Sequence, residues 1–97
     1  MSEFKGSKSP WLISGESEKW NRIVDANGDL ITTCFAMQNE DDANANLIAA
    51  APELLEACLR IQAHFRQAGI ESAAGSLNPI EDNAAQIDAV ILKALGR

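Results

Sequence analysis

The sequence predicts an α+β fold, in which a small antiparallel sheet of about three strands over residues 11–36 is followed by two or three packed α-helices. Two patterns predict this order. The pair Asn27-Gly28 stands between two apolar segments, which is typical of the tip of a β-hairpin. Beyond the hairpin, apolar residues recur at intervals of three and four positions, as on one face of a helix. The apolar segment Trp11-Leu12-Ile13 supplies the third strand.

The hairpin tip sets the register of its two strands. With a two-residue type I′ turn at Asn27-Gly28, three cross-strand pairs follow: Val24 with Ile31, Arg22 with Thr33, and Trp20 with Phe35. One face then carries large apolar side chains and is predicted to be the core face: Trp20, Val24, Ile31 and Phe35. The opposite face is mixed in polarity and is expected to be partly covered or to lie at an interface: Asn21, Ile23, Asp25, Leu30, Thr32 and Cys34.

Residues 43–68 are predicted to be helical, with an apolar stripe formed by Leu54, Cys58, Ile61 and Phe65. Pro52 interrupts this region, because proline lacks an N–H donor and its ring clashes with the preceding turn. We expect a short helix over 43–51, a bend, and a longer helix that begins near Pro52; a single kinked helix is the alternative. Asp41 or Asp42 is expected to cap the start, and Gly69 to end the region.

The last helix has clear boundary residues. Asn78 is the expected N-cap, Pro79 takes the first helical position, and Glu81 is placed to reach back in a capping-box arrangement. Gly96 is expected to end the helix. An apolar stripe is predicted along it: Ile80, Ala84, Ile87, Ile91 and Ala94 or Leu95.

Length and charge limit the classes of function. A chain of 97 residues is expected to form one domain, here over residues 10–97, preceded by a flexible tail over 1–9. The net charge of −6 disfavours direct binding to nucleic acid, because the phosphate backbone is negative as well. We expect no secretory signal and no membrane span, and therefore a soluble protein in the cytoplasm of the host cell.

No combination of residues predicts catalysis, a metal site or a cofactor. Cys34 and Cys58 are expected to remain reduced and to act as small packing residues. His64 is expected to be exposed on the helix face opposite the apolar stripe, without a carboxylate partner. The sequence therefore predicts a protein that is not an enzyme.

A few residues are candidates for binding. Trp11 and Trp20 are either core anchors or interface anchors, since tryptophan is common in both places. Asn44 and Asn46 lie on an alanine-rich helix surface that permits close helix contact, either for internal packing or for the seam of a homodimer, and a homodimer is expected. The expected partners of a phosphate-bearing ligand are Arg22, Arg60 and Arg66.

Three segments in order resemble a widespread group of small phage and prophage accessory proteins. They are Pro10-Trp11, IVDANGDLI at 23–31, and ANANLIAAAPELLEACL at 43–59. The helical segment is the most specific of the three. The resemblance implies a phage-related context, and it transfers no catalytic residue to this chain.

Three functions are therefore weighed. The first is a phage-derived binding protein that inhibits or modulates a host protein, for instance in a host defence system. The second is a protein that binds or sequesters a small signalling nucleotide. The third, an enzyme, is ranked last because no catalytic arrangement is visible in the sequence.

Overall fold

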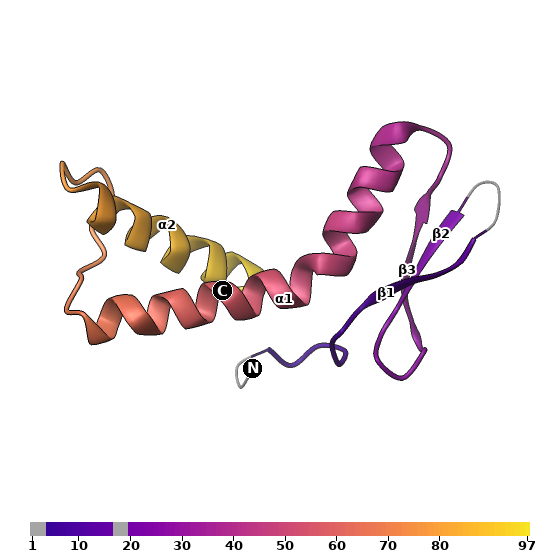
Figure 1. The fold of residues 1–97 in the computed structure, drawn as a ribbon, viewed down its shortest axis with the longest axis horizontal. Coiled ribbons are helices and arrows are strands. Elements are labelled where there is room, and N and C mark those ends of the chain that lie inside the picture. Colours follow the sequence, from indigo (N-terminus) through magenta and orange to yellow (C-terminus); the bar gives the residue numbers. More distant parts are fainter. Residues whose placement is uncertain (1–3, 17–19) are drawn as a thin grey trace. The chain divides into compact units, whose positions relative to one another are not determined.

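The computed structural model describes residues 4–16 and 20–97, and it has the predicted α+β arrangement of three strands followed by two helices (Figure 1). The elements, in chain order, are β1 (Leu12–Glu16), β2 (Trp20–Val24), β3 (Leu30–Phe35), α1 (Asn39–Gln67) and α2 (Pro79–Ala94). The predicted last helix is confirmed almost residue for residue, because Pro79 and the C-terminal glycine mark its two ends.

The chain divides into two compact units, and the division falls inside α1. The sheet unit comprises Lys5–Leu54, and the helical-hairpin unit comprises Leu55–Arg97 with Phe4. The expectation of one domain over residues 10–97 stays a prediction, as does a flexible tail over 1–9. Part of that tail is hydrogen-bonded: the indole Nε1 of Trp11 donates to the carbonyl of Ser7 (3.1 Å). Residues 1–3 lie outside the described residues.

The sheet is antiparallel, with strand order β1-β2-β3. Two predicted cross-strand pairs are confirmed, Arg22 with Thr33 and Trp20 with Phe35. The third is wrong, because Val24 lies opposite Leu30 and the register shifts between Ile23 and Val24.

The shift follows from the turn, which differs from the predicted type I′. Among the described residues, no residue other than glycine has a positive φ, so Asn27 does not adopt the conformation that a type I′ turn needs. The N–H of Gly28 donates to the carbonyl of Asp25 (3.0 Å), and Gly28 itself has φ +86°. The carboxylate of Asp25 accepts from the N–H groups of Asn27 (2.9 Å) and Asp29 (3.0 Å). These bonds favour a three-residue loop whose glycine forms a bulge.

The buried face of the hairpin is the one predicted to be mixed. Ile23 is fully buried and Asn21 is buried beside it, whereas the predicted core residues Trp20 and Phe35 are 43% and 58% exposed. The reason is that the first part of α1 covers the Asn21 face, where the Nδ2 of Asn21 donates to the Oδ1 of Asp42 (3.1 Å). Val24 is buried as predicted, next to the register shift.

α1 is a single helix from Asn39 to Gln67 with Pro52 inside it. The expectation of a short helix over 43–51 followed by a second helix is therefore wrong, and the alternative of one helix is confirmed. The carboxylate of Asp41 accepts from the backbone N–H groups of Met37 and Gln38 (both 3.1 Å), which anchors the helix start earlier than predicted. Because Pro52 has no N–H, the helix lacks the hydrogen bond that would reach the carbonyl of Ile48.

The helical-hairpin unit joins the last part of α1 to α2. The Nε2 of Gln62 donates to the Oδ1 of Asp88 (2.7 Å), and Leu55, Ala84 and Ile91 are buried. Leu55 and Gln62, seven positions apart, therefore lie on the side of α1 toward α2, and Ile61 and Phe65 of the predicted stripe line a groove beside this contact. Leu54 and Ile61 of the stripe predicted on α1 are exposed. Of the stripe predicted on α2, Ala84 and Ile91 are buried as expected, whereas Ile80 is exposed.

The start of α2 corrects the predicted capping box. Asn78 caps the helix as predicted, since its Oδ1 accepts from the N–H of Ile80 (3.1 Å). Glu81, however, accepts from the hydroxyl of Ser76 (2.7 Å), and the Oγ of Ser76 accepts from the N–H of Asn78 (3.1 Å). The serine thus stands between the two groups that a capping box joins directly.

Candidate functional site

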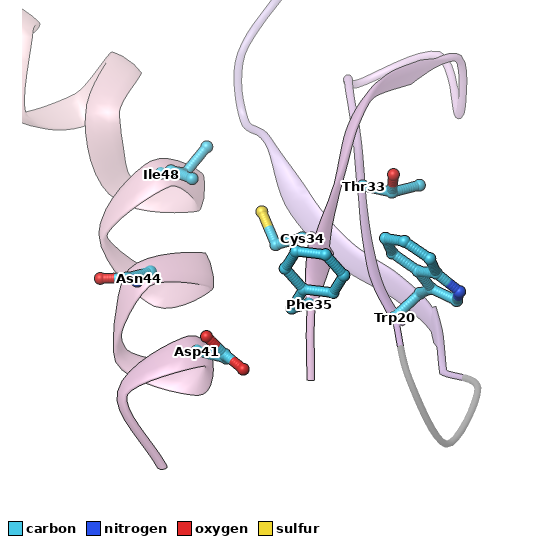
Figure 2. Close-up of a pocket in the computed structure, with 7 residues that line it drawn as sticks. All are labelled: Trp20, Thr33, Cys34, Phe35, Asp41, Asn44 and Ile48. Carbon is cyan, nitrogen blue, oxygen red and sulfur yellow. The ribbon is translucent and has the colours of Figure 1, made fainter. Parts of the chain in front are cut away.

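The candidate site is a cavity of about 270 Å³ inside the sheet unit, which we name the β3-edge cavity (Figure 2). Two strands and α1 contribute its seven lining residues: Trp20, Thr33, Cys34, Phe35, Asp41, Asn44 and Ile48.

The cavity lies along the free edge of β3. It is lined by three consecutive residues of that strand, Thr33, Cys34 and Phe35, whose side chains alternate between the two faces of the sheet. A cavity that meets both faces of a strand passes around its edge. One edge of β3 is paired with β2, so the cavity lies at the other.

An aromatic pair forms one wall. The rings of Trp20 and Phe35 are stacked, with centroids 4.9 Å apart and an angle of 24° between their planes. Both residues are exposed, although such rings dominate the cores and interfaces of proteins. Figure 2 shows the two rings beside each other and Cys34 pointing from β3 toward α1. The pair forms an exposed apolar surface.

The opposite wall comes from α1. Asp41, Asn44 and Ile48 lie three and four positions apart, a spacing that places them on one side of the helix. The adjacent side of the helix, with Asp42 and the buried Ala45, covers the sheet. The first turn of α1 is acidic, with Glu40 next to the two aspartates. This wall therefore offers an amide, an apolar side chain and negative charge.

The lining residues include no histidine, lysine or arginine. Within residues 4–16 and 20–97, no group of three or more His, Cys, Asp or Glu side chains is arranged to hold a metal ion. Cys34 is a half-buried free thiol. The chemistry that this arrangement supports is binding, through apolar contact and through hydrogen bonds at the strand edge, Asn44 and Asp41.

Two of the four predicted interface residues meet here, because Trp20 and Asn44 both line the cavity. Asn46 is exposed on α1 but does not line it, and Trp11 is half-buried with its indole bonded to the carbonyl of Ser7. Phe35 lines the cavity as well, although its sequence pattern predicts a core residue. The uncharged sequence of β3 is a signal that could have marked its edge as a site.

The three predicted ligand-binding arginines lie in different places. Arg22 is exposed on β2 in the sheet unit, whereas Arg60 and Arg66 belong to the helical-hairpin unit. Six positions apart in one helix, the latter two point in directions that differ by about 120° around the helix axis. Arg60 forms an ion pair with Glu56 (2.5 Å).

Arg66 lines a cavity of about 290 Å³ in the helical-hairpin unit, together with Asp88 and Arg97. The hydrogen bond from Gln62 is the main cause that lowers the pKa of Asp88 below its ordinary value, with smaller contributions from Ser72 and from the charge of Arg66. Arg66 therefore already faces a carboxylate of its own chain.

His64 is exposed, as predicted. No helix among the described residues combines the length and the apolar character needed to cross a membrane.

The family model described as Salmonella phage P22 protein Y8K6 matches residues 1–97. No curated protein and no solved structure matches the chain.

Proposed function

The chain belongs to the family of Salmonella phage P22 protein Y8K6, and on that premise we propose that it is a non-enzymatic binding protein that inhibits or modulates a host protein. The proposed place of action is the cytoplasm of the host cell, and components of a host defence system are one class of target. The phage origin supports a role toward the host, and the β3-edge cavity supports binding as the means.

The observation that carries the proposal is the exposed, stacked pair of Trp20 and Phe35 beside this cavity. A few large aromatic residues carry most of the binding energy in protein interfaces. A stacked pair is also expected to lose less conformational freedom than two separate side chains when a partner covers it, because each ring already packs against the other.

Affinity capture from a lysate of the bacterial host, followed by titration of the captured partner, tests the proposal. Replacing either ring, as Trp20→Ala or Phe35→Ala, is expected to weaken binding about 30-fold, which is the effect of a typical hot-spot residue. Leu12→Ala is the matched control, because Leu12 is equally exposed but lies in β1 at the other edge of the sheet. Its affinity should stay within about twofold of the wild type.

Absence of any stoichiometric partner that depends on the two rings contradicts the proposal. A partner lost equally in all three variants contradicts the assignment of the surface.

We also propose that the protein is a homodimer joined through the helical-hairpin unit. A cavity of about 530 Å³ between the end of α1 and α2 supports this, because none of its lining residues is charged: Ile61, Phe65, Asn83, Gln86, Ile87 and Val90. In a chain with a net charge of −6, an uncharged apolar surface can meet its own copy without like-charge repulsion.

The alternative, binding of a signalling nucleotide by Arg22, Arg60 and Arg66, has weaker support. Arg60 is paired with Glu56, and Arg66 faces Asp88, so a phosphate would compete with carboxylates of the chain itself. Thermal unfolding with a panel of nucleotides tests this alternative, because a ligand that binds the folded state raises the midpoint. We expect no nucleotide to do so.

A further inference from the structure

We propose that the partner binds by strand addition: an extended, basic segment of the host protein lies in the β3-edge cavity and pairs with the free edge of β3. This inference rests on the proposed function and adds the mode of recognition and the chemistry of the segment.

The unpaired edge of β3 is the surface to which a strand would be added. Among the described strands, β3 pairs only with β2, so one row of its backbone N–H and C=O groups is not used by the sheet. Natural sheet edges are protected by charged residues, proline or bulges. β3 has the sequence LITTCF, which contains no charge, proline or glycine, and its register shift lies at the far end near Leu30. Such an edge is a template for another strand.

The β3-edge cavity supplies the space that an added strand needs. The cavity separates the edge of β3 from Asp41, Asn44 and Ile48 of α1. In an added strand, successive side chains point to opposite faces. One set would meet the rings of Trp20 and Phe35, and the other would meet Cys34 and Ile48. The main chain would supply affinity, and these two apolar surfaces would select the side chains.

The negative charge at the start of α1 favours a basic segment. The first turn of α1 holds three carboxylates, Glu40, Asp41 and Asp42, and the cavity lining has no basic residue. A lysine or arginine in the added strand would be attracted to this turn. Pairing of β3 with β3 of a second copy would bring two such acidic turns together, which costs energy. Charge therefore favours a basic segment of another protein over a second copy.

The test uses the full chain and a defined probe, a capped peptide of about eight residues in which lysine and valine alternate. Calorimetry measures binding, and hydrogen exchange measured by mass spectrometry follows the backbone of β3. We expect the probe to bind and to slow exchange in Leu30–Phe35, because the added strand occupies the free N–H groups. A peptide with glutamate in place of lysine should bind at least tenfold more weakly, since several charges change sign.

Two further probes report on backbone pairing. In each, alternate residues carry an N-methyl group, which removes the amide hydrogen, and the two probes differ by one position. An added strand directs alternate N–H groups toward its neighbour. One methylated probe should therefore lose binding and the other should keep it within a few fold. Equal binding of both probes contradicts strand pairing.

Two variants test the attraction between the acidic first turn of α1 and the lysine probe. Glu40→Gln is expected to weaken binding of the lysine probe about two- to fivefold, because an exposed ion pair contributes little. The carboxylate of Glu40 makes none of the hydrogen bonds that hold the helix start, which belong to Asp41 and Asp42. Glu53→Gln removes an exposed carboxylate elsewhere on α1 and should leave binding unchanged.

The outcomes separate this inference from the proposed function. If the lysine probe does not bind, or binds without slowing exchange in β3, strand addition is wrong, while a partner captured through Trp20 and Phe35 would still support the proposed function. If the probe binds as expected and no host partner depends on those rings, the proposed function fails instead. Slowed exchange in β3 that depends on protein concentration without any peptide would show pairing with a second copy and overturn the inference.

Discussion

The two units of the chain leave different kinds of surface uncovered. In the sheet unit, Ile23 is fully buried, buried polar groups such as Asn21 are hydrogen-bonded, and the open side is a strand edge with directional backbone groups. In the helical-hairpin unit, the open side is an uncharged groove between helices, where apolar contact dominates. A strand edge selects an extended segment with a matching backbone, whereas an uncharged helix groove can accept a copy of itself. The two units thus differ in the kind of partner that each uncovered surface would fit.

The largest expected effect comes from the apolar side chain that is fully buried in the sheet unit. Ile23→Ala removes the fully buried side chain of the sheet unit and is expected to lower the free energy of unfolding by about 3 kcal/mol. Ile61→Ala, the control in the helical-hairpin unit, removes a side chain that is 41% exposed and should cost about 1 kcal/mol or less. Urea denaturation measures both values. Equal losses would mean that the buried Ile23 stabilises the fold no more than the exposed Ile61 does.

The hairpin turn gives the next largest effect. Asp25→Ala is expected to destabilise the protein by about 2 kcal/mol, because the N–H groups of Asn27 and Asp29 lose a buried charged acceptor. Asp29→Ala is the control, since the Asp29 side chain is exposed, and its effect should stay within about 0.5 kcal/mol. The same denaturation experiment measures both. A small effect of Asp25→Ala would assign the turn geometry to Gly28 alone.

The place of the hairpin could be predicted from the sequence, but the type of its turn could not. Asn27-Gly28 correctly located the hairpin and two of its cross-strand pairs. The turn type depended on the Asp25 carboxylate, whose hydrogen bonds to two N–H groups favour a longer loop. A local pattern thus placed the hairpin but not the bulge at its base.

The buried face of the sheet could not be chosen from the strands alone. The Trp20 face is the more apolar of the two, yet α1 covers the face that carries Asn21 and Ile23. That choice depends on tertiary contacts with α1, which include the burial of Ala45 and the hydrogen bond of Asn21 to Asp42, 21 residues apart. Trp20 and Asn44 were identified as candidate interface residues, but Phe35 was not, because its exposure follows from the same contacts.

The interhelical hydrogen bond of the helical-hairpin unit should give the smallest effect, and one that depends on pH. The pKa of Asp88 is lower in the folded state than its ordinary value of 3.8, so its ionised form contributes stability above that pH. This contribution is lost as the pH falls through the folded-state pKa. In Asp88→Asn the contribution is absent at every pH.

Unfolding free energies of the wild type and Asp88→Asn, measured from neutral pH downward, check this dependence. The difference between the two proteins should be constant near neutral pH and should narrow below 3.8. A difference that widens on acidification would show that the shift has the opposite sign.

The division of binding between the two units is the central claim, and one set of measurements tests it directly: the mass of the protein in solution and its affinity for the captured host partner, for three variants. Phe35→Ala, in the sheet unit, should lose the partner and remain dimeric. Val90→Glu places a charge in the uncharged groove of the helical-hairpin unit and should be monomeric while keeping the partner. Leu92→Glu, on an exposed position of α2 outside that groove, should change neither. Loss of both properties in one variant, or a wild type that is monomeric, would contradict the claim.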